Sequence, residues 1–186
     1  MSSAPRIATD RLSLTSLSRS DAEALFAYRS LPEVCRYQGW RPARLEDAVV
    51  FIEWLGRLDF DSPDTWSQFG IRLVHSDALI GDVGVHFLQE AEQFEIGFTL
   101  APAVQGRGLA TEAVTALLDY LFGPLKKHRA CASVDPRNAA SLRLLRRLGM
   151  RQEAHFRQSV NVDGEWTDDL VFAVLRSEWE LRQSVG

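Results

Sequence analysis

The stretch from Gln93 to Phe122 constrains the fold more than any other part of the sequence. Its first eight residues alternate between apolar and polar or small side chains, which is the period of a β-strand. Its last part carries apolar residues at helical spacing, at Ala110, Ala113, Val114, Leu117, Leu118, Leu121 and Phe122. Pro102 ends the strand, and Gly123 ends the helix. The stretch therefore predicts a strand, a glycine-containing turn and a helix.

The turn from Gln105 to Ala110 favours anion binding. A helix N-terminus leaves backbone N–H groups without partners and carries a partial positive charge. Glycines such as Gly106 and Gly108 let a phosphate approach those groups closely. A Walker loop is excluded because Leu109 follows Gly108, and a dinucleotide fingerprint is disfavoured because Thr111 replaces its third glycine. Taken alone, the turn also fits a helix that simply begins with glycines.

The remaining pattern predicts one domain over residues 1–186. Strands are expected at 7–17, 66–74, 79–88, 93–100, 130–134, 152–162 and 165–175. Helices are expected at 21–29, 45–58, 110–122 and 139–148, with a loop at 31–44 and a short terminal helix at 177–183. Asp163-Gly164 predicts a hairpin turn. We thus expect an α/β (α+β) fold, with a mixed, mostly antiparallel, twisted sheet of about seven strands flanked by about four helices.

Composition narrows the classes of partner. The net charge of -4 and the pI of about 5.6 give no help to non-specific nucleic-acid binding. No apolar run approaches the roughly 20 residues of a membrane span, and the first residues lack a signal-peptide core, so a cytoplasmic protein is expected. Cys35 and Cys131 are too few for a disulfide framework, and no ligand spacing suggests a metal.

Four separate motifs, in order along the chain, resemble the GCN5-related N-acetyltransferases (GNAT). The turn fits Gln/Arg-x-x-Gly-x-Gly/Ala through Gln105, Gly108 and Ala110. Residues 138–150 look like the family's Asn-x-x-Ala/Ser helix, with Met150 in place of its usual Phe. The opening at 7–14 and the end at 163–179 resemble the RimJ/RimL-type branch, which is similar to ribosomal-protein-alanine N-acetyltransferases. The resemblance covers nearly the whole chain.

The resemblance implies acetyl-CoA as the acetyl donor, without a metal. The pyrophosphate site would then consist of Gln105, Gly106, Arg107, Gly108, Leu109 and Ala110. The pantetheine arm would pair with Phe98, Thr99 and Leu100 and contact Asn138 and Ser141, although Asn138 also fits a plain helix cap. Arg143, Arg146 and Lys127 are candidates for the 3′-phosphate, against the simpler interpretation of solvated surface charges.

Acyl transfer to an amine needs a neutral amine, whereas a free lysine titrates near pH 10.4. Glu95 is the candidate general base, with an ordinary surface glutamate as the alternative. Many relatives place a tyrosine acid where this chain has Leu145, so Ser141 is the remaining donor for the thiolate, unless the proton passes directly from the tetrahedral intermediate. Tyr37 and Trp40 lie in the expected acceptor loop, where core packing is the alternative. Asp168 is a candidate for orienting the amine.

These expectations lead to three functional hypotheses. The first is an acetyl-CoA-dependent N-acetyltransferase that acts on a primary amine, of a protein N-terminus or a small molecule, by direct attack in a ternary complex. The second, motivated by Leu145, is a non-catalytic acyl-CoA-binding module. The third is an enzyme that acetylates antibiotic-like amines. An acidic rim would favour a cationic acceptor, and it is expected at Glu90, Glu92, Glu95, Asp163, Glu165, Asp168 and Asp169. A homodimer is a family-level expectation.

Overall fold

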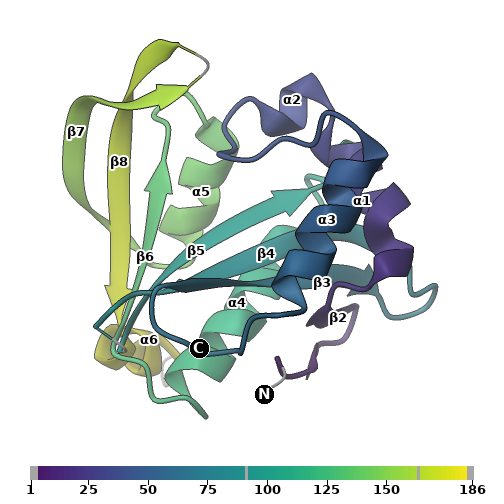
Figure 1. Ribbon diagram of the computed structural model, residues 1–186. Helices are drawn as coiled ribbons and strands as arrows, with labels where there is room; N and C mark the ends of the chain where they lie inside the picture. The colour runs from purple at the N-terminus through teal and green to yellow at the C-terminus, as the bar shows by residue number, and fades with distance from the viewer. Residues whose placement is uncertain (1–3, 91, 163, 184–186) are drawn as a thin grey trace.

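An eight-stranded sheet forms the centre of the protein, which a computed structural model describes at residues 4–90, 92–162 and 164–183. Its strands lie in the order β1-β2-β3-β4-β5-β6-β8-β7 (Figure 1). The first four are β1 (Ile7–Ala8), β2 (Leu12–Ser16), β3 (Thr65–Leu73) and β4 (Leu79–Phe87). The others are β5 (Gln93–Leu100), β6 (Arg129–Val134), β7 (Arg151–Val162) and β8 (Glu165–Leu175). The expected mixed and mostly antiparallel sheet is confirmed.

The strands β5 and β6 form the parallel pair that the sequence predicts. Their register is short, since Gln93, Phe94 and Glu95 pair with Arg129, Ala130 and Cys131, and no later pair joins them within the described residues. Beyond Glu95 the two strands diverge, as Figure 1 shows, while β6 continues alongside β8. The sheet therefore opens at the carboxyl ends of β5 and β6.

The order of helices and strands follows the prediction, with two local differences. The expected strand at 7–17 is two strands, because the chain turns between them and the Thr9 N–H donates to the Leu12 carbonyl oxygen at 2.9 Å. The expected loop at 31–44 contains the short helix α2 (Pro32–Cys35), which starts at a proline, a residue suited to a first helical turn.

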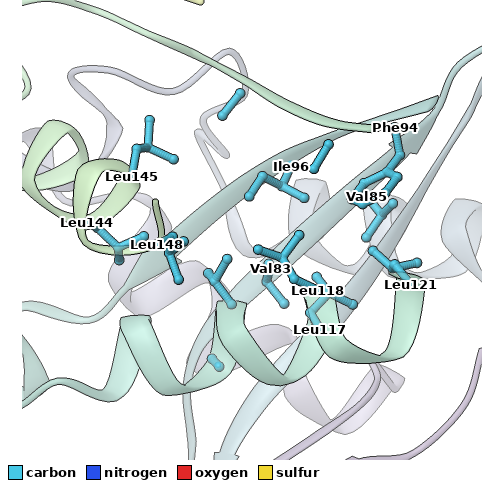
Figure 2. Packing of buried hydrophobic residues seen from close by; sticks show 14 of the residues in the cluster. Val83, Val85, Phe94, Ile96, Leu117, Leu118, Leu121, Leu144, Leu145 and Leu148 are labelled. Atoms are coloured by element: carbon cyan, nitrogen blue, oxygen red, sulfur yellow. The ribbon is translucent and has the colours of Figure 1, made fainter. Parts of the chain in front are cut away.

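The helices cover both faces of the sheet. They are α1 (Ala22–Arg29), α2, α3 (Leu45–Leu55), α4 (Leu109–Phe122), α5 (Ala139–Arg147) and α6 (Arg176–Gln183). Leu117, Leu118 and Leu121 of α4 pack against Val83 and Val85 of β4 and share one core with leucines of α5 (Figure 2). A second, smaller cluster joins α1, α2 and α3. Together these contacts fix α4 on one face and α1 to α3 on the other (Figure 1).

The alternation of β5 separates core residues from residues available to a site. Phe94 and Ile96 are buried against α4. Because successive side chains point to opposite faces of a strand, Glu95, Gly97 and Thr99 face the side of α1 to α3. The predicted hairpin between β7 and β8 is confirmed by the pairing of Val162 with Glu165 and by Gly164 at φ 89°, while Asp163 lies outside the described residues.

Candidate active site

A cavity of about 530 Å³ lies between the end of β5, the turn before α4 and the first turns of α5. Its walls include Phe98, Thr99, Leu100, Gln105, Gly106 and Gly108, and on the other side Asn138, Ser141 and Arg143. We call it the donor cavity. Five of the six residues expected to cradle a pyrophosphate line it, and Arg107 does not.

The turn before α4 presents backbone N–H groups to this cavity. Gly106 and Gly108 both have φ 76°, a left-handed conformation that glycine adopts without strain. Gly108 is the N-cap of α4, so the N–H groups that follow it have no partner within the helix. A Cβ atom at Gly106 would meet nothing within 4 Å, which leaves open space in front of the turn. The turn therefore fits a phosphate group bound at a helix N-terminus.

Two residues from the start of the chain hold this turn in place. The Arg11 Nη1 donates to the Arg107 carbonyl oxygen at 3.2 Å. Its Nε donates to Glu112, in the first turn of α4, at 2.6 Å, and the Thr9 hydroxyl donates to the same carboxylate at 2.6 Å. Burial opposes ionisation of Glu112, but the hydrogen bonds from Thr9 and Arg11 outweigh it and hold the pKa below its ordinary value. The Arg11 charge offsets this acid beside a turn suited to anions.

Thr99 provides a buried polar group at the wall of the donor cavity. Its hydroxyl oxygen is buried and has no hydrogen-bond partner within the described residues, although it lines the donor cavity. A buried polar atom without a partner is costly in a native protein unless a ligand satisfies it. Thr99 lies in the segment of β5 expected to pair with a pantetheine arm, so its hydroxyl is placed to accept a hydrogen bond from a ligand in the donor cavity or to donate one to it.

A second cavity, of about 770 Å³, opens on the other side of β5, where β5 and β6 diverge. Trp66, Glu95 and Gly97 form part of its floor, and the loop after α2 and the β7–β8 hairpin form two of its walls. We call it the acceptor cavity. The two cavities meet at five residues that line both, namely Tyr37, Gln38, Phe98, Asn138 and Ser141.

Glu95 lies on the floor of the acceptor cavity in an environment that disfavours its charge. Burial raises the pKa of Glu95 above its ordinary value, and Asp169 raises it further, while His86 and the Ser133 N–H act in the opposite direction. The Ser133 hydroxyl donates to Asp169 at 2.6 Å, which places a second carboxylate on the same floor. A carboxylate with a raised pKa, open to a cavity, is suited to accept a proton.

The start of α5 brings two of the predicted residues to the junction. The Asn138 side chain accepts a hydrogen bond from the Ser141 N–H at 3.1 Å, so the capping role is confirmed. Ser141 borders both cavities. Leu145, one turn further along the helix, also lines the acceptor cavity but offers no donor. Ser141 is therefore the hydroxyl that α5 presents to this junction.

The acceptor residues are only partly brought together. Tyr37 and Asp168 line the acceptor cavity, where Asp168 accepts from the Gln158 N–H at 2.9 Å and lies 2.6 Å from His155 Nε2, contacts that lower its pKa. Trp40 lines neither cavity, because its ring stacks on Phe51 with 4.2 Å between centroids. Trp40 therefore packs against α3, which is the alternative role that the sequence left open for it.

The structure separates two of the candidates for the 3′-phosphate, and it shows one residue at the junction that the sequence did not indicate. Lys127 is buried and paired with Asp61, away from both cavities, whereas Arg143 borders the donor cavity. Gln38 lines both cavities, and no motif in the sequence singles it out. Its environment depends on contacts with α1, which only the folded chain brings near.

Comparison with known proteins settles the family. A family model described as the acetyltransferase (GNAT) domain matches residues 11–151. The chain belongs to the GNAT acetyltransferase family. That family transfers an acetyl group from acetyl-CoA to an amine, and the predicted family and enzyme class are confirmed.

Several relatives span almost the whole of this GNAT chain. YnaD of Bacillus subtilis, an uncharacterized N-acetyltransferase, is 31% identical over 173 residues that cover 93% of this chain and 98% of the relative. The ribosomal protein uS5-alanine N-acetyltransferase of Escherichia coli is 28% identical over 181 residues, covering 94% and 92%. A crystal structure of a GNAT-family acetyltransferase from Bacillus anthracis has a TM-score of 0.84 at 28% identity, covering 94% and 100%. The protein is thus an N-acetyltransferase.

Two further findings concern this GNAT protein as far as the structure describes it. Across residues 4–90, 92–162 and 164–183, none of the helices combines the length and hydropathy that crossing a bilayer requires. In the same residues, no three His, Cys, Asp or Glu side chains gather into a group that would hold a metal ion.

Proposed function

We propose that this protein transfers the acetyl group of acetyl-CoA to a primary amine by direct attack in a ternary complex. The observation that carries the proposal is the meeting of two cavities at Phe98, Asn138 and Ser141. One cavity ends at a glycine turn suited to a pyrophosphate, and the other has a partly buried carboxylate, Glu95, on its floor. A thioester reaching the junction from one side would meet an amine arriving from the other.

Each residue near the junction has a separate role in this proposal. The turn from Gln105 to Ala110 binds the pyrophosphate through backbone N–H groups, and Phe98 to Leu100 bind the pantetheine arm. Glu95 accepts a proton from the ammonium form of the acceptor, directly or through water, so that a neutral amine attacks. The Ser141 hydroxyl donates a hydrogen bond to the departing thiolate.

The acceptor is proposed to be a cationic primary amine, at a protein N-terminus or on a small molecule. Glu95, Asp168 and Asp169 place acidic side chains around the acceptor cavity, which attracts a positive group. The similarity to an alanine N-acetyltransferase supports the first of the two acceptor types. Action on an antibiotic-like amine is the competing proposal, and it differs only in the acceptor.

Release of CoA from acetyl-CoA, measured by thiol titration against a panel of amines, tests the proposal. The panel contains peptides that begin with alanine or serine, the same peptides with a blocked N-terminus, polyamines and aminoglycosides. We expect turnover with at least one free amine and none with its blocked form. Tight CoA binding without turnover on any amine would contradict the proposal. A preference for peptides over aminoglycosides separates the two acceptor types.

A further inference from the structure

The loop after α2 crosses the junction of the two cavities. Gln38 in this loop lines both cavities. Its neighbour Tyr37 donates a hydrogen bond from its hydroxyl to the Arg137 carbonyl oxygen at 3.4 Å, so the loop reaches the turn before α5. The Gln38 N–H donates to the Cys35 carbonyl oxygen at 3.0 Å, which ties the loop back to α2. Gln38 is therefore held over the point where donor and acceptor would meet.

The orientation of the Gln38 side-chain amide follows from its partner. The Gln38 Oε1 accepts a hydrogen bond from Arg29 Nη1 at 3.1 Å. A guanidinium group can only donate, and a glutamine amide has one accepting oxygen and one NH₂ group with two donors. The contact therefore fixes the oxygen toward Arg29 and turns the NH₂ group away from it. Within the described residues that NH₂ group has no protein partner, although the side chain borders both cavities.

Arg29 is itself fixed by a buried partner on β4. Arg29 is 7% exposed and Asp82 is 0% exposed. The Arg29 Nε donates to one Asp82 oxygen at 3.1 Å, and its Nη2 donates to the other oxygen. The Tyr28 hydroxyl donates to the same carboxylate at 2.6 Å, and Gln68 also donates to it. Burial opposes the charge on Arg29, but Asp82 outweighs it and raises the pKa of Arg29, so the group stays a donor.

We propose that Gln38 is a further catalytic residue whose NH₂ group donates a hydrogen bond to the thioester oxygen during acetyl transfer. Arg29 and Asp82 are then positioning residues that hold this amide in its donating orientation. The inference rests on the proposed function, because it assigns a role at the junction of the same two cavities. A donor fixed in advance stabilises the negative oxygen of an acyl-transfer intermediate more effectively than a mobile one.

During the proposed reaction, Gln38 stabilises the negative charge that forms on the thioester oxygen. The amine nitrogen attacks the thioester carbon, a C–N bond forms, and the carbonyl π electrons move to the oxygen. Gln38 donates to that oxygen. The intermediate then reforms its carbonyl group, the C–S bond breaks, and its electron pair leaves with sulfur. The proton lost by the amine passes through Glu95 or water to the thiolate, which gives the amide and free CoA.

Two substitutions at Gln38 separate the donor from the rest of the side chain. Gln38→Glu keeps the size and the oxygen that faces Arg29 but removes the NH₂ donor, and Gln38→Leu removes both. The matched control, Gln89→Glu, makes the same chemical change at an exposed position outside both cavities. We expect kcat to fall about 100-fold in both Gln38 variants, as for loss of one oxyanion donor, with the Kd for CoA within about twofold of wild type. Wild-type kcat in Gln38→Glu and Gln38→Leu would overturn the inference, as would a kcat loss matched by an equal loss of CoA affinity.

A second experiment tests the positioning role through the buried ion pair. Replacing both partners of such a pair by apolar residues avoids leaving one buried charge alone. Tyr28 and Gln68 also lose the carboxylate to which they donate, so we expect the double variant Arg29→Met/Asp82→Leu to remain folded with a Tm a few degrees below the wild-type value. Its kcat should nevertheless fall about as far as in Gln38→Glu, because the amide loses the partner that orients it. Wild-type kcat in a folded double variant would overturn the positioning role.

The wild-type assay separates failure of this inference from failure of the proposed function. A wild-type enzyme that releases no CoA with any amine overturns both. An active wild-type enzyme whose Gln38 variants are equally active overturns the inference alone. Adding Gln38→Leu to the double variant should cause no further loss of kcat, since coupled residues are not additive. A full second loss would show that Gln38 acts without Arg29.

Discussion

Arg11 and Glu112 are 101 positions apart in the sequence and meet at the N-terminus of α4. The Arg11 guanidinium donates to the Glu112 carboxylate at 2.6 Å, and the Arg11 backbone N–H donates to it at 3.2 Å. The same guanidinium reaches the carbonyl oxygen of Arg107 in the glycine turn. The start of the chain thus neutralises an acid and fixes a loop beside the proposed pyrophosphate site. This contact gives a physical reason for the occurrence of the 7–14 motif together with the glycine turn in one chain.

Arg11→Met should weaken CoA binding more than it weakens the fold. The Arg11 side chain is 51% exposed, so its ion pair contributes roughly 0–1 kcal/mol to stability. Without Arg11, however, the Glu112 charge faces the incoming pyrophosphate and the turn loses one anchor. We expect the Kd for CoA, measured by calorimetry, to rise about 10-fold, as for loss of one charge-assisted contact.

The variant Glu112→Gln supplies the control for that prediction. If uncompensated charge causes the loss, Arg11→Met/Glu112→Gln should regain much of the CoA affinity that Arg11→Met loses. Raising the salt concentration should also reduce the defect of the single variant. A double variant no better than Arg11→Met would mean that Arg11 acts only by anchoring the turn at Arg107.

Gly108→Ala should remove most CoA binding. Gly108 has φ 76°, and an alanine there is strained by roughly 1–2 kcal/mol. Relief of that strain would turn the following N–H groups away from the donor cavity. We expect the Kd for CoA to rise by more than about 10-fold, which isothermal titration measures directly.

Gly164→Ala is the matched control, because Gly164 has φ 89° in the β7–β8 turn and a Cβ there meets nothing within 4 Å. The two variants carry comparable backbone strain, so both should lose a few degrees of Tm. Only Gly108→Ala should lose CoA affinity. Equal CoA affinity in the two variants would contradict the assigned role of the turn.

The parts of the fold that the sequence predicts are those specified by local signals. The turn before α4, the cap at Asn138 and the alternation of β5 each depend on a few neighbouring residues, and all three occur as expected. The prediction of a single strand at 7–17 was wrong in detail. The alternation continues on both sides of the turn that the hydrogen bond between Thr9 and Leu12 closes, so the pattern gave no sign of a break. The turn contains Asp10 but neither glycine nor proline, so its local signal was weak.

The acceptor side of the site was harder to predict because its geometry depends on tertiary contacts. Trp40 and Gln38 are two residues apart in one loop, yet Trp40 stacks on α3 while Gln38 lines both cavities. Arg29, on another helix, contacts both residues: it lies over the Trp40 ring and donates a hydrogen bond to the Gln38 side chain. The aromatic signal selected Tyr37, which lines both cavities, and Trp40, which packs on α3, whereas Gln38 carries no such signal and was missed.

Ser141→Ala tests whether the chain needs a hydroxyl where Leu145 replaces the usual acid. The cap of α5 uses the Ser141 backbone N–H, so removing the hydroxyl should leave the helix intact. We expect kcat to fall about 10-fold, the effect of one hydrogen bond to a charged group, with an unchanged Kd for CoA. Ser141→Thr keeps a hydroxyl and should retain most of the activity. Full activity in Ser141→Ala would indicate that the intermediate passes its proton to the thiolate directly.

Glu95 combines a functional role with a cost to stability. Burial, with Asp169 nearby, raises the pKa of Glu95 above the ordinary glutamate value of 4.5. As pH rises past 4.5, the unfolded chain loses this proton before the folded protein does. The free energy of unfolding therefore falls with rising pH until the folded carboxyl has also ionised. Because of the same shift, Glu95 becomes protonated, and can no longer act as a base, at a higher pH than an exposed glutamate does.

Glu95→Gln should therefore lower activity while raising stability at neutral pH. Loss of a general base reduces kcat/KM by roughly 100-fold or more, which thiol release with the preferred amine would measure. Thermal unfolding at neutral pH should show a Tm gain of about 2 °C over wild type, and the gain should vanish near pH 4, where both states of the wild type hold the proton. The matched control is Glu90→Gln, at an exposed position outside both cavities, which should change neither quantity. A Glu95→Gln enzyme with wild-type kcat/KM at every pH would assign proton removal to water, and one that is less stable at neutral pH would contradict the burial of this charge.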